Sequence, residues 1–205
     1  MIVVVDYEMG NAGSILNMLA KIGAPAVLTR DPRQIRSAEK LILPGIGAFD
    51  EGMDKLESLG LVPVLTDRVL RDGTPILGIC LGMQLFAGGS EEGSRKGLSW
   101  IDGTCERFST DPSDRGLRVP HMGWNRLRLR KSSAVFRDLE DDARFYFVHS
   151  YHLRCRDDDD VLATTSYGVE FVSALSRDRI VGVQFHPEKS LRWGIGLFRR
   201  FVSGA

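Results

Sequence analysis

The chain has 205 residues, of which 43% are hydrophobic, and 27 Lys plus Arg balance 27 Asp plus Glu. This length suits one domain with a well-filled core, which we place over residues 1–205, and the composition excludes a wholly disordered chain. Zero net charge argues against a surface built for nucleic acid, because such a surface needs a clustered excess of cations. Three cysteines are too few for a disulfide scaffold.

The apolar runs of the chain are short, and its first residues are not basic. Residues 1–7 reach an acidic side chain without a basic leader, so we expect no signal peptide. The uncharged stretch over residues 73–90 is broken by glycine and proline, and its apolar runs cannot span the ~30 Å hydrocarbon core of a bilayer. We therefore expect a cytoplasmic protein in a reducing compartment.

The first half of the chain alternates buried strands with amphipathic helices. Residues 2–5 are β-branched, which is typical of a strand buried on both faces, and residues 11–22 carry an apolar stripe at helical spacing. The alternation predicts an α/β fold with a central, mostly parallel sheet and helices on both faces. The other elements expected in this half are strands at 26–28, 40–43 and 75–79 and helices at 49–59, 62–71 and 81–86.

The second half is typical of short strands closed by one helix, at residues 194–202. Short connections with turn formers, such as Tyr167-Gly168, predict a smaller antiparallel sheet. The four acidic residues 157–160 are expected to form a solvated loop between strands. The strands are expected at 106–108, 126–129, 144–148, 162–166, 169–175 and 180–184.

Cys80 lies where a predicted strand ends and a predicted helix begins, in the segment Gly-Ile-Cys-Leu-Gly. Gly-x-Cys-x-Gly is the thiol form of the nucleophile elbow, a strained turn that points the nucleophile out of the sheet. Glycine is needed at 78 and 82, where a Cβ would clash, and the helix N-terminus favours the thiolate. The free amide of Leu81 can donate to an oxyanion. The alternative is a buried structural cysteine, the usual fate of this residue type.

A cysteine nucleophile needs a base, and His186 follows the last predicted strand. Glu188, two residues on, can fold back onto the imidazole, fix its tautomer and stabilise its cation. Because the ends of parallel strands gather at one edge of a sheet, Cys80 and His186 can meet there. The pattern predicts a Cys-His-Glu triad.

Glycines also follow the predicted strand at 40–43, in Pro44-Gly45-Ile46-Gly47. One interpretation is an ordinary strand-to-helix turn. The functional interpretation is a set of backbone amides that stabilises a developing oxyanion. A phosphate-binding loop is excluded because no Lys-Ser or Lys-Thr follows.

Three motifs occur in order: Pro-Gly-Ile-Gly-Ala-Phe at 44–49, Gly-Ile-Cys-Leu-Gly-Met-Gln at 78–84 and Gln-Phe-His-Pro-Glu-Lys-Ser at 184–190. Together they resemble the class I, triad-type glutamine amidotransferases over residues 2–202. The resemblance implies a flavodoxin-like fold, no cofactor and no metal, and hydrolysis of L-glutamine to glutamate and ammonia. It implies that Cys80 attacks the side-chain amide, that His186 protonates the leaving ammonia and then activates water, and that Glu188 orients His186.

The resemblance also implies roles for residues around the triad. The backbone amides implied to form the oxyanion hole are those of Gly45, Ile46, Gly47 and Leu81. The residues implied to hold the amino-acid end of glutamine are Gln84, Glu92, Ser150 and Tyr151.

Further segments, Val-Pro-His-Met-Gly-Trp-Asn at 119–125 and Tyr-Phe-Val-His-Ser-Tyr at 146–151, are similar to one branch of this family. That branch forms a heterodimer with a (β/α)8 cyclase of the HisF type, which receives the ammonia and makes imidazole glycerol phosphate and an aminoimidazole carboxamide ribotide in histidine biosynthesis. Without the resemblance, Met122 and Trp124 are expected in the core and Lys189 in solvent. The residues implied to face the partner are Asn11, Met122, Trp124 and Lys189.

Two departures and several alternatives accompany this resemblance. Asp6-Tyr7 and Gly10-Asn11 form an N-terminal motif that is also similar to this branch, and Glu8 stands where that motif usually has glycine. Residues 191–194 after the Lys-Ser pair also differ. A paralogue that supplies ammonia for an amidino sugar in surface-polysaccharide biosynthesis fits the same chemistry. A non-catalytic scaffold for a barrel partner and a cysteine peptidase on the same fold are further alternatives. Cys105 and Cys155 are expected to be structural, because their spacing fits no metal site.

Overall fold

The structure, a computed structural model, describes residues 1–109 and 118–204. Its strands are β1 (Ile2–Val5), β2 (Ala26–Thr29), β3 (Lys40–Leu43), β4 (Ile76–Ile79), β5 (Gly103–Arg107), β6 (His121–Arg126), β7 (Arg128–Leu129), β8 (Arg144–His149), β9 (Tyr151–Cys155), β10 (Val161–Tyr167), β11 (Val169–Arg177) and β12 (Ile180–Val183). Its α-helices are α1 (Ala12–Lys21), α2 (Pro32–Arg36), α3 (Phe49–Ser58), α4 (Leu61–Thr66), α5 (Leu81–Gln84) and α6 (Leu191–Gly204). No helix in these two ranges is long and apolar enough to cross a membrane.

One large sheet organises the molecule. In the described ranges it has eight strands in the order β2-β1-β3-β4-β12-β11-β10-β7. Neighbours from β2 to β12 run parallel, and those from β12 to β7 run antiparallel. The predicted α/β fold with a mainly parallel sheet is therefore confirmed.

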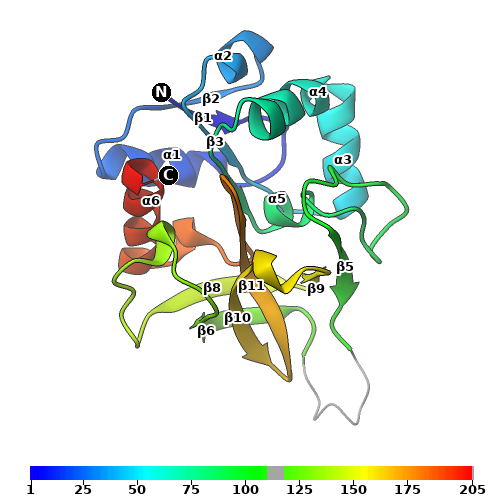
Figure 1. Ribbon diagram of the computed structural model, residues 1–205, viewed down its shortest axis with the longest axis vertical. Helices are drawn as coiled ribbons and strands as arrows, with labels where there is room; N and C mark the ends of the chain where they lie inside the picture. Colours follow the sequence, from blue (N-terminus) through cyan, green and yellow to red (C-terminus); the bar gives the residue numbers. More distant parts are fainter. Residues whose placement is uncertain (110–117, 205) are drawn as a thin grey trace.

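Alternating residues of the parallel strands face two different groups of helices. Val3 and Leu41 belong to the core under α2, α3, α4 and α5, whereas Val4 and Ile42 belong to the core under α1 and α6. This period of two is what a strand buried on both faces requires. Figure 1 shows the result: α1 and α6 lie on one side of the sheet, and α3, α4 and α5 lie on the other.

The second half differs from the prediction of one smaller antiparallel sheet. The antiparallel strands β11, β10 and β7 extend the main sheet, and the described residues form two further pairs, β5 with β9 and β6 with β8. The strand expected at 126–129 is split between the end of β6 and β7. Strand β6 was not predicted, because its sequence, His-Met-Gly-Trp-Asn-Arg, contains no β-branched residue. Alternate residues of this strand are exposed, so it also lacks a continuous apolar run.

Two local predictions are also corrected. The helix expected at 62–71 is α4 followed by a π-helical turn at Asp67–Arg71. The acidic run is not wholly solvated, because Asp160 is buried and accepts a hydrogen bond from Arg177 Nε at 2.8 Å. The burial of Asp160 follows from its partner on β11, since a charged group leaves water only when it is paired.

Strands β4 and β12 lie side by side in parallel register, with Gly78 opposite Gly182 and Ile79 opposite Val183. The residues that follow each strand therefore leave the sheet together at one edge. Next to them, a Cβ on Gly82 in α5 would lie only 2.0 Å from the carbonyl oxygen of Leu43 in β3. The first turn of α5 thus rests directly on the backbone at the end of β3.

We expect Gly82→Ala to lower the free energy of unfolding by ~3 kcal/mol or more, the upper end of the overpacking range, because the backbone must move. The matched control is Gly13→Ala in α1, where an added Cβ meets nothing within 4 Å. That control should raise stability by ~0.5–1 kcal/mol. Urea unfolding measures both variants, and equal effects would contradict the close contact.

Candidate active site

Cys80 occupies the junction between β4 and α5. Its backbone has φ 53° and ψ −109°, a strained conformation for a residue with a Cβ. Its N–H donates to the Val183 carbonyl at 2.8 Å, which ties the junction to β12. A Cβ on Gly78 would lie 2.6 Å from the Phe86 ring, so packing on the strand side admits only glycine. The junction has the geometry of a nucleophile elbow.

His186 and Glu188 follow β12 and form a buried pair. His186 Nδ1 lies 2.8 Å from Glu188 Oε1, and both side chains are almost completely shielded from solvent. Burial lowers the pKa of His186, but Cys80 and Glu188 outweigh burial and raise the pKa to about 10. With Nδ1 held by the carboxylate, Nε2 is the nitrogen left to exchange a proton, and it has no hydrogen-bond partner in the described part of the chain.

Ser190 holds the turn that carries His186. Its hydroxyl donates to the His186 carbonyl at 2.6 Å and accepts the Tyr146 N–H at 3.0 Å. The His186 N–H in turn donates to the Tyr146 carbonyl at 2.8 Å. These bonds anchor the imidazole to β8. Ser190 belongs to the motif at 184–190 but had no predicted role.

A cavity of about 280 Å³ opens at this edge of the sheet. It brings together most residues proposed for catalysis or substrate binding, although Gly45 and Glu188 do not belong to its lining. Pro120, Val148 and His149 also line it, although the sequence analysis gave them no role in the site. The full lining is Ile46, Gly47, Cys80, Leu81, Gln84, Glu92, Pro120, Val148, His149, Ser150, Tyr151 and His186.

The glycine-rich turn after β3 packs against the start of α5. A Cβ on Gly45 would lie 2.7 Å from the backbone nitrogen of Gly82 and 2.7 Å from the Leu81 Cβ. Gly47 has φ 121°, a conformation that side chains rarely adopt, and Ile46 and Gly47 face the cavity. The turn therefore stands next to the amide that opens α5, where an oxyanion hole would need it.

Tyr7 supports the glycine-rich turn after β3. Its hydroxyl donates to the Pro44 carbonyl at 2.5 Å, and its ring is fully buried. Burial, followed by the charge of Cys80, raises the pKa of Tyr7, so the hydroxyl keeps its proton. No sequence pattern points to Tyr7, because its contact joins the segment after β1 to the segment after β3, which meet only in the folded sheet.

The amide of Gln84 has both hydrogens engaged. Its Nε2 donates to the Tyr151 carbonyl at 2.9 Å and to Gln184 Oε1 at 3.0 Å. A ligand in the cavity can therefore meet only the carbonyl oxygen of Gln84, which is an acceptor. Glu92 adds a carboxylate, one oxygen of which accepts the Phe49 N–H at 2.9 Å. Both residues line the cavity, and acceptors of this kind suit an ammonium group.

The residues expected at a partner interface lie on the surface. Met122 and Trp124 on β6 are 62% and 43% exposed, so the expectation of core burial for them is wrong. The Trp124 ring meets the Tyr146 ring edge-on at 5.9 Å, and Lys189 Nζ lies 5.7 Å from the centre of the Tyr146 ring. Met122, Trp124 and Lys189 are exposed, and together with the half-buried Tyr146 they form one strip on the surface, called here the exposed strip. Asn11 instead caps α1, since its side-chain oxygen accepts the Ser14 N–H at 3.3 Å.

Comparison with known proteins gives a family match over nearly the whole chain. The family described as "Glutamine amidotransferase class-I" matches residues 3–202. A relative from Methanococcus maripaludis, "Imidazole glycerol phosphate synthase subunit HisH 2", is 48% identical over 100% of both chains. A Pseudomonas aeruginosa relative of the same name is 48% identical over 98% of each chain. A Leptospira borgpetersenii protein named subunit HisH is 42% identical over 99% of this chain and 100% of its own.

Solved structures show the same fold at lower identity. A putative GMP synthase protein from Thermoplasma acidophilum matches with a TM-score of 0.72 at 21% identity, over 98% of this chain and 91% of that one. PurLQS from Thermotoga maritima matches with a TM-score of 0.69 at 18% identity, over 98% and 96%. These likenesses support the fold.

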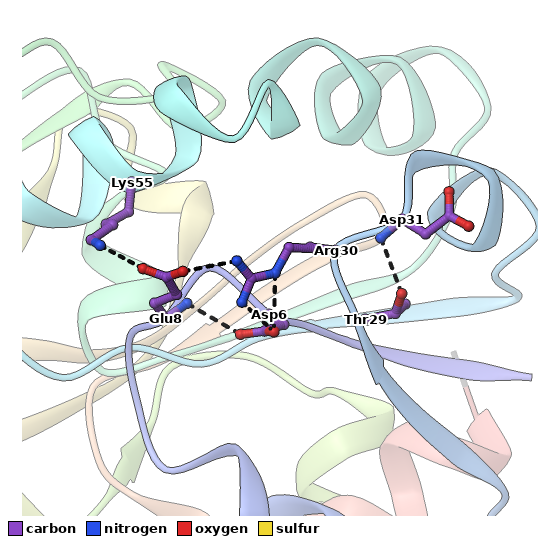
Figure 2. Close-up of polar contacts among 6 residues, drawn as sticks. All are labelled: Asp6, Glu8, Thr29, Arg30, Asp31 and Lys55. Atoms are coloured by element: carbon purple, nitrogen blue, oxygen red, sulfur yellow. Dashed lines mark hydrogen bonds and ion pairs between the residues drawn. The ribbon is translucent and has the colours of Figure 1, made fainter.

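Glu8 joins three segments near this site. Figure 2 shows its carboxylate between Arg30, after β2, and Lys55 on α3, at 2.8 and 2.5 Å. Arg30 also pairs with Asp6 at 2.8 Å. Hydrogen bonds from Lys55 and then Arg30 lower the pKa of Glu8 to about 2. Glu8 has φ 66°, which explains why glycine suits this position and why the ion pairs must hold it.

The same loop touches the glycine-rich turn. A Cβ on Gly47 would lie 2.8 Å from Met9 Cε, and one on Gly10 would lie 3.0 Å from the Gly45 nitrogen. Helix α3, which carries Lys55, begins two residues after Gly47. The loop after β1 packs against the glycine-rich turn, and α3 follows the turn in sequence. The ion pair between Glu8 and Lys55 therefore joins this loop to α3.

We expect Glu8→Gln to lower the melting temperature at low ionic strength, because it removes the charge that attracts both cations. The loss should shrink in ~1 M salt, where the Debye length is ~3 Å. Glu140→Gln is the control, since Glu140 pairs with the single cation Arg192 and should change the melting temperature less. A loss that is the same at both salt concentrations would contradict an electrostatic role.

Proposed function

Since the chain belongs to the class I glutamine amidotransferase family, we propose that Cys80, His186 and Glu188 hydrolyse the side-chain amide of L-glutamine to glutamate and ammonia. Within that family the chain is a HisH-type glutaminase subunit of imidazole glycerol phosphate synthase, in histidine biosynthesis. The observation that carries the catalytic assignment is the shared cavity, in which a strained cysteine and a carboxylate-backed imidazole lie beside a glycine-rich turn.

In the first step the Cys80 thiolate attacks the amide carbon of glutamine, and the carbonyl oxygen becomes an oxyanion. Backbone amides of Leu81 and of the turn at Gly45, Ile46 and Gly47 stabilise that charge. The raised pKa of His186 means that it begins this step as an imidazolium. It gives its Nε2 proton to the leaving nitrogen, so ammonia departs and a glutamyl thioester remains on Cys80.

In the second step neutral His186 removes a proton from water, which attacks the thioester carbon. The carbon–sulfur bond breaks, glutamate forms, and the thiolate and imidazolium are restored. Glu188 acts through His186 in both steps, because its bond to Nδ1 holds the ring orientation and favours the cation. No proton is consumed beyond the one that leaves with ammonia, which the attacking water replaces.

The amino-acid end of the substrate is held at the far end of the cavity. The free oxygen of Gln84 and the carboxylate of Glu92 accept hydrogen bonds from the α-ammonium group. Ser150 and Tyr151, at the start of β9, offer polar groups to the α-carboxylate. With its amino-acid end held there, glutamine is long enough for its side-chain amide to reach Cys80.

The ammonia passes to a HisF-type (β/α)8 cyclase subunit docked on the exposed strip. Ammonia that escapes into water is protonated and loses its nucleophilicity, so a direct transfer protects it. Support comes from the position of the strip, because Met122 pairs with Val148, a residue of the cavity wall. Exposed Met and Trp with Lys at their rim have the composition of a docking surface. Asn11 is assigned to the same surface by the family resemblance.

One observation supports a second candidate function. The Methanococcus maripaludis and Pseudomonas aeruginosa relatives carry the number 2 in their names, which leaves room for more than one chain of this type in an organism. A second chain is free to supply ammonia to an amidino sugar of a surface polysaccharide, with a HisF-like partner. Isolating the partner, and then testing whether a ribonucleotide or a sugar substrate stimulates glutamine cleavage, separates the two functions.

We expect Cys80→Ser to lower glutaminase activity of the complex ~10³-fold or more, as loss of a catalytic nucleophile does. The cyclase reaction supplied with free ammonia should continue, because it bypasses Cys80. Cys155→Ser is the matched control and should leave both activities unchanged. Retained glutamine hydrolysis in the Cys80 variant would contradict the mechanism, and cleavage of peptides in place of glutamine would favour a peptidase.

We expect the isolated chain to release little glutamate from glutamine. Ile46 and Gly47 line the cavity from an exposed turn, whose amides a bound partner can align. Adding the cyclase subunit with its ribonucleotide should raise glutamate release by ~10-fold or more, within the usual range of allosteric coupling. Equal rates with and without the partner would contradict the coupling.

A further inference from the structure

Gln184 lies directly beside the proposed nucleophile. It follows β12, two residues before His186, and is completely buried. Its Oε1 accepts a hydrogen bond from Gln84 Nε2 at 3.0 Å, and its Nε2 donates to Cys80 Sγ at 3.7 Å, a distance suited to sulfur. Neither the triad nor the substrate-binding set includes this residue.

The amide of Gln184 has only one orientation that satisfies its neighbours. The Tyr151 carbonyl can only accept, so the group of Gln84 that faces it must be the nitrogen. The same nitrogen faces Gln184, which must therefore present its oxygen to Gln84. The nitrogen of Gln184 is left to face Cys80. A flipped Gln184 would set two NH2 groups against each other in a buried site, where unpaired donors are costly.

The Tyr151 carbonyl is itself held by a chain of neutral side chains. His149 Nδ1 donates to it at 2.8 Å, so His149 Nε2 must accept from His121 Nδ1 at 3.1 Å. His121 Nε2 then accepts from Asn125 Nδ2 at 3.4 Å. Burial lowers the pKa of His149 to about 3 and that of His121 to about 4, which keeps both rings neutral. The bonds from Asn125 through the two rings therefore all point toward the Tyr151 carbonyl, which also accepts from Gln84, and the bonds from Gln84 through Gln184 point toward the sulfur.

We propose that Gln184 is a further catalytic residue, whose Nε2–H donates to the Cys80 thiolate, and that Gln84 is the positioning residue that aims this donor. The proposal rests on the proposed function only in taking Cys80 as the nucleophile. An N–H donor stabilises an anion strongly in a buried site, where water cannot take its place. The sulfur thus has a neutral donor from Gln184 in addition to the His186 imidazolium, and the donor raises the fraction of Cys80 that is ready to attack.

The test measures the alkylation of Cys80 by iodoacetamide on the full chain as a function of pH, with peptide mass spectrometry to separate it from Cys105 and Cys155. Gln184→Met removes the donor at nearly constant size, and Gln184→Glu places a carboxylate oxygen against the sulfur. His186, backed by Glu188, and Tyr7 also act on this sulfur and are the same in every variant.

We expect the midpoint of the pH–rate profile to move to higher pH in both variants and further in Gln184→Glu. At neutral pH, alkylation of Cys80 in Gln184→Met should fall ~10-fold, the size of one hydrogen bond to a charged group. Gln84→Met, which frees the Gln184 amide to rotate, should give a smaller shift in the same direction. The matched control is Gln34→Met, at an exposed glutamine of α2, which should leave the profile unchanged.

Profiles of the Gln184 variants that superimpose on that of the unaltered chain would overturn the proposal, and an unshifted Gln84→Met profile would overturn the positioning role. Should the variants fail to fold, the side-chain 15N resonance of Gln184 in the unaltered chain supplies the test. It should follow the titration of Cys80, and a resonance that does not move would also refute the contact. Glutaminase activity surviving in Cys80→Ser would refute the mechanism instead, so the two failures are distinguishable.

Discussion

The contact between the first turn of α5 and the end of β3 decides the geometry of the site. A Cβ on Gly82 would lie 2.0 Å from the Leu43 carbonyl, and one on Gly45 would lie 2.7 Å from the Gly82 nitrogen. With no side chain between them, the two backbones touch, and the amides after β3 reach the same cavity as the thiol of Cys80. The strained φ of Cys80 persists because the packing on both sides leaves the junction no alternative.

Parallel pairing of β4 with β12 supplies the rest of the triad. The register sets Ile79 opposite Val183, so Gln184 leaves the sheet beside Cys80 although the two residues are 104 positions apart. His186 follows two residues later, and Ser190 ties its turn to β8. The pairing of β4 with β12 and the Ser190 hydroxyl thus position the His186 imidazole. Glu188 adds one hydrogen bond to Nδ1 of that ring.

Six polar groups beside the cavity form a hydrogen-bonded network with one consistent assignment of donors and acceptors. Asn125, His121 and His149 lead to the Tyr151 carbonyl, and Gln84 and Gln184 lead from it to the sulfur. Such a network is stable in a buried site only when the donor of each bond faces an acceptor, because two facing donors or two facing acceptors leave a polar group without a partner. The exposed ion pairs of Glu8 join the loop after β1 to α3, next to the glycine-rich turn. Buried hydrogen bonds and a solvent-facing ionic contact thus support different parts of one site.

The parallel half of the fold could be predicted from local pattern, because each strand is an unbroken apolar run and each helix shows its stripe. The elbow at Cys80 and the His186–Glu188 pair were equally visible, since their spacing along the chain is short. Strand β6, the burial of Asp160 and the exposure of Met122 and Trp124 were not, because each depends on which neighbour the folded chain supplies. The sequence by itself determined the order of strands and helices and the residue types at their ends. Tertiary structure alone decided that Tyr7, Gln184 and Ser190 support the site, because their hydrogen bonds join segments that meet only when the sheet assembles.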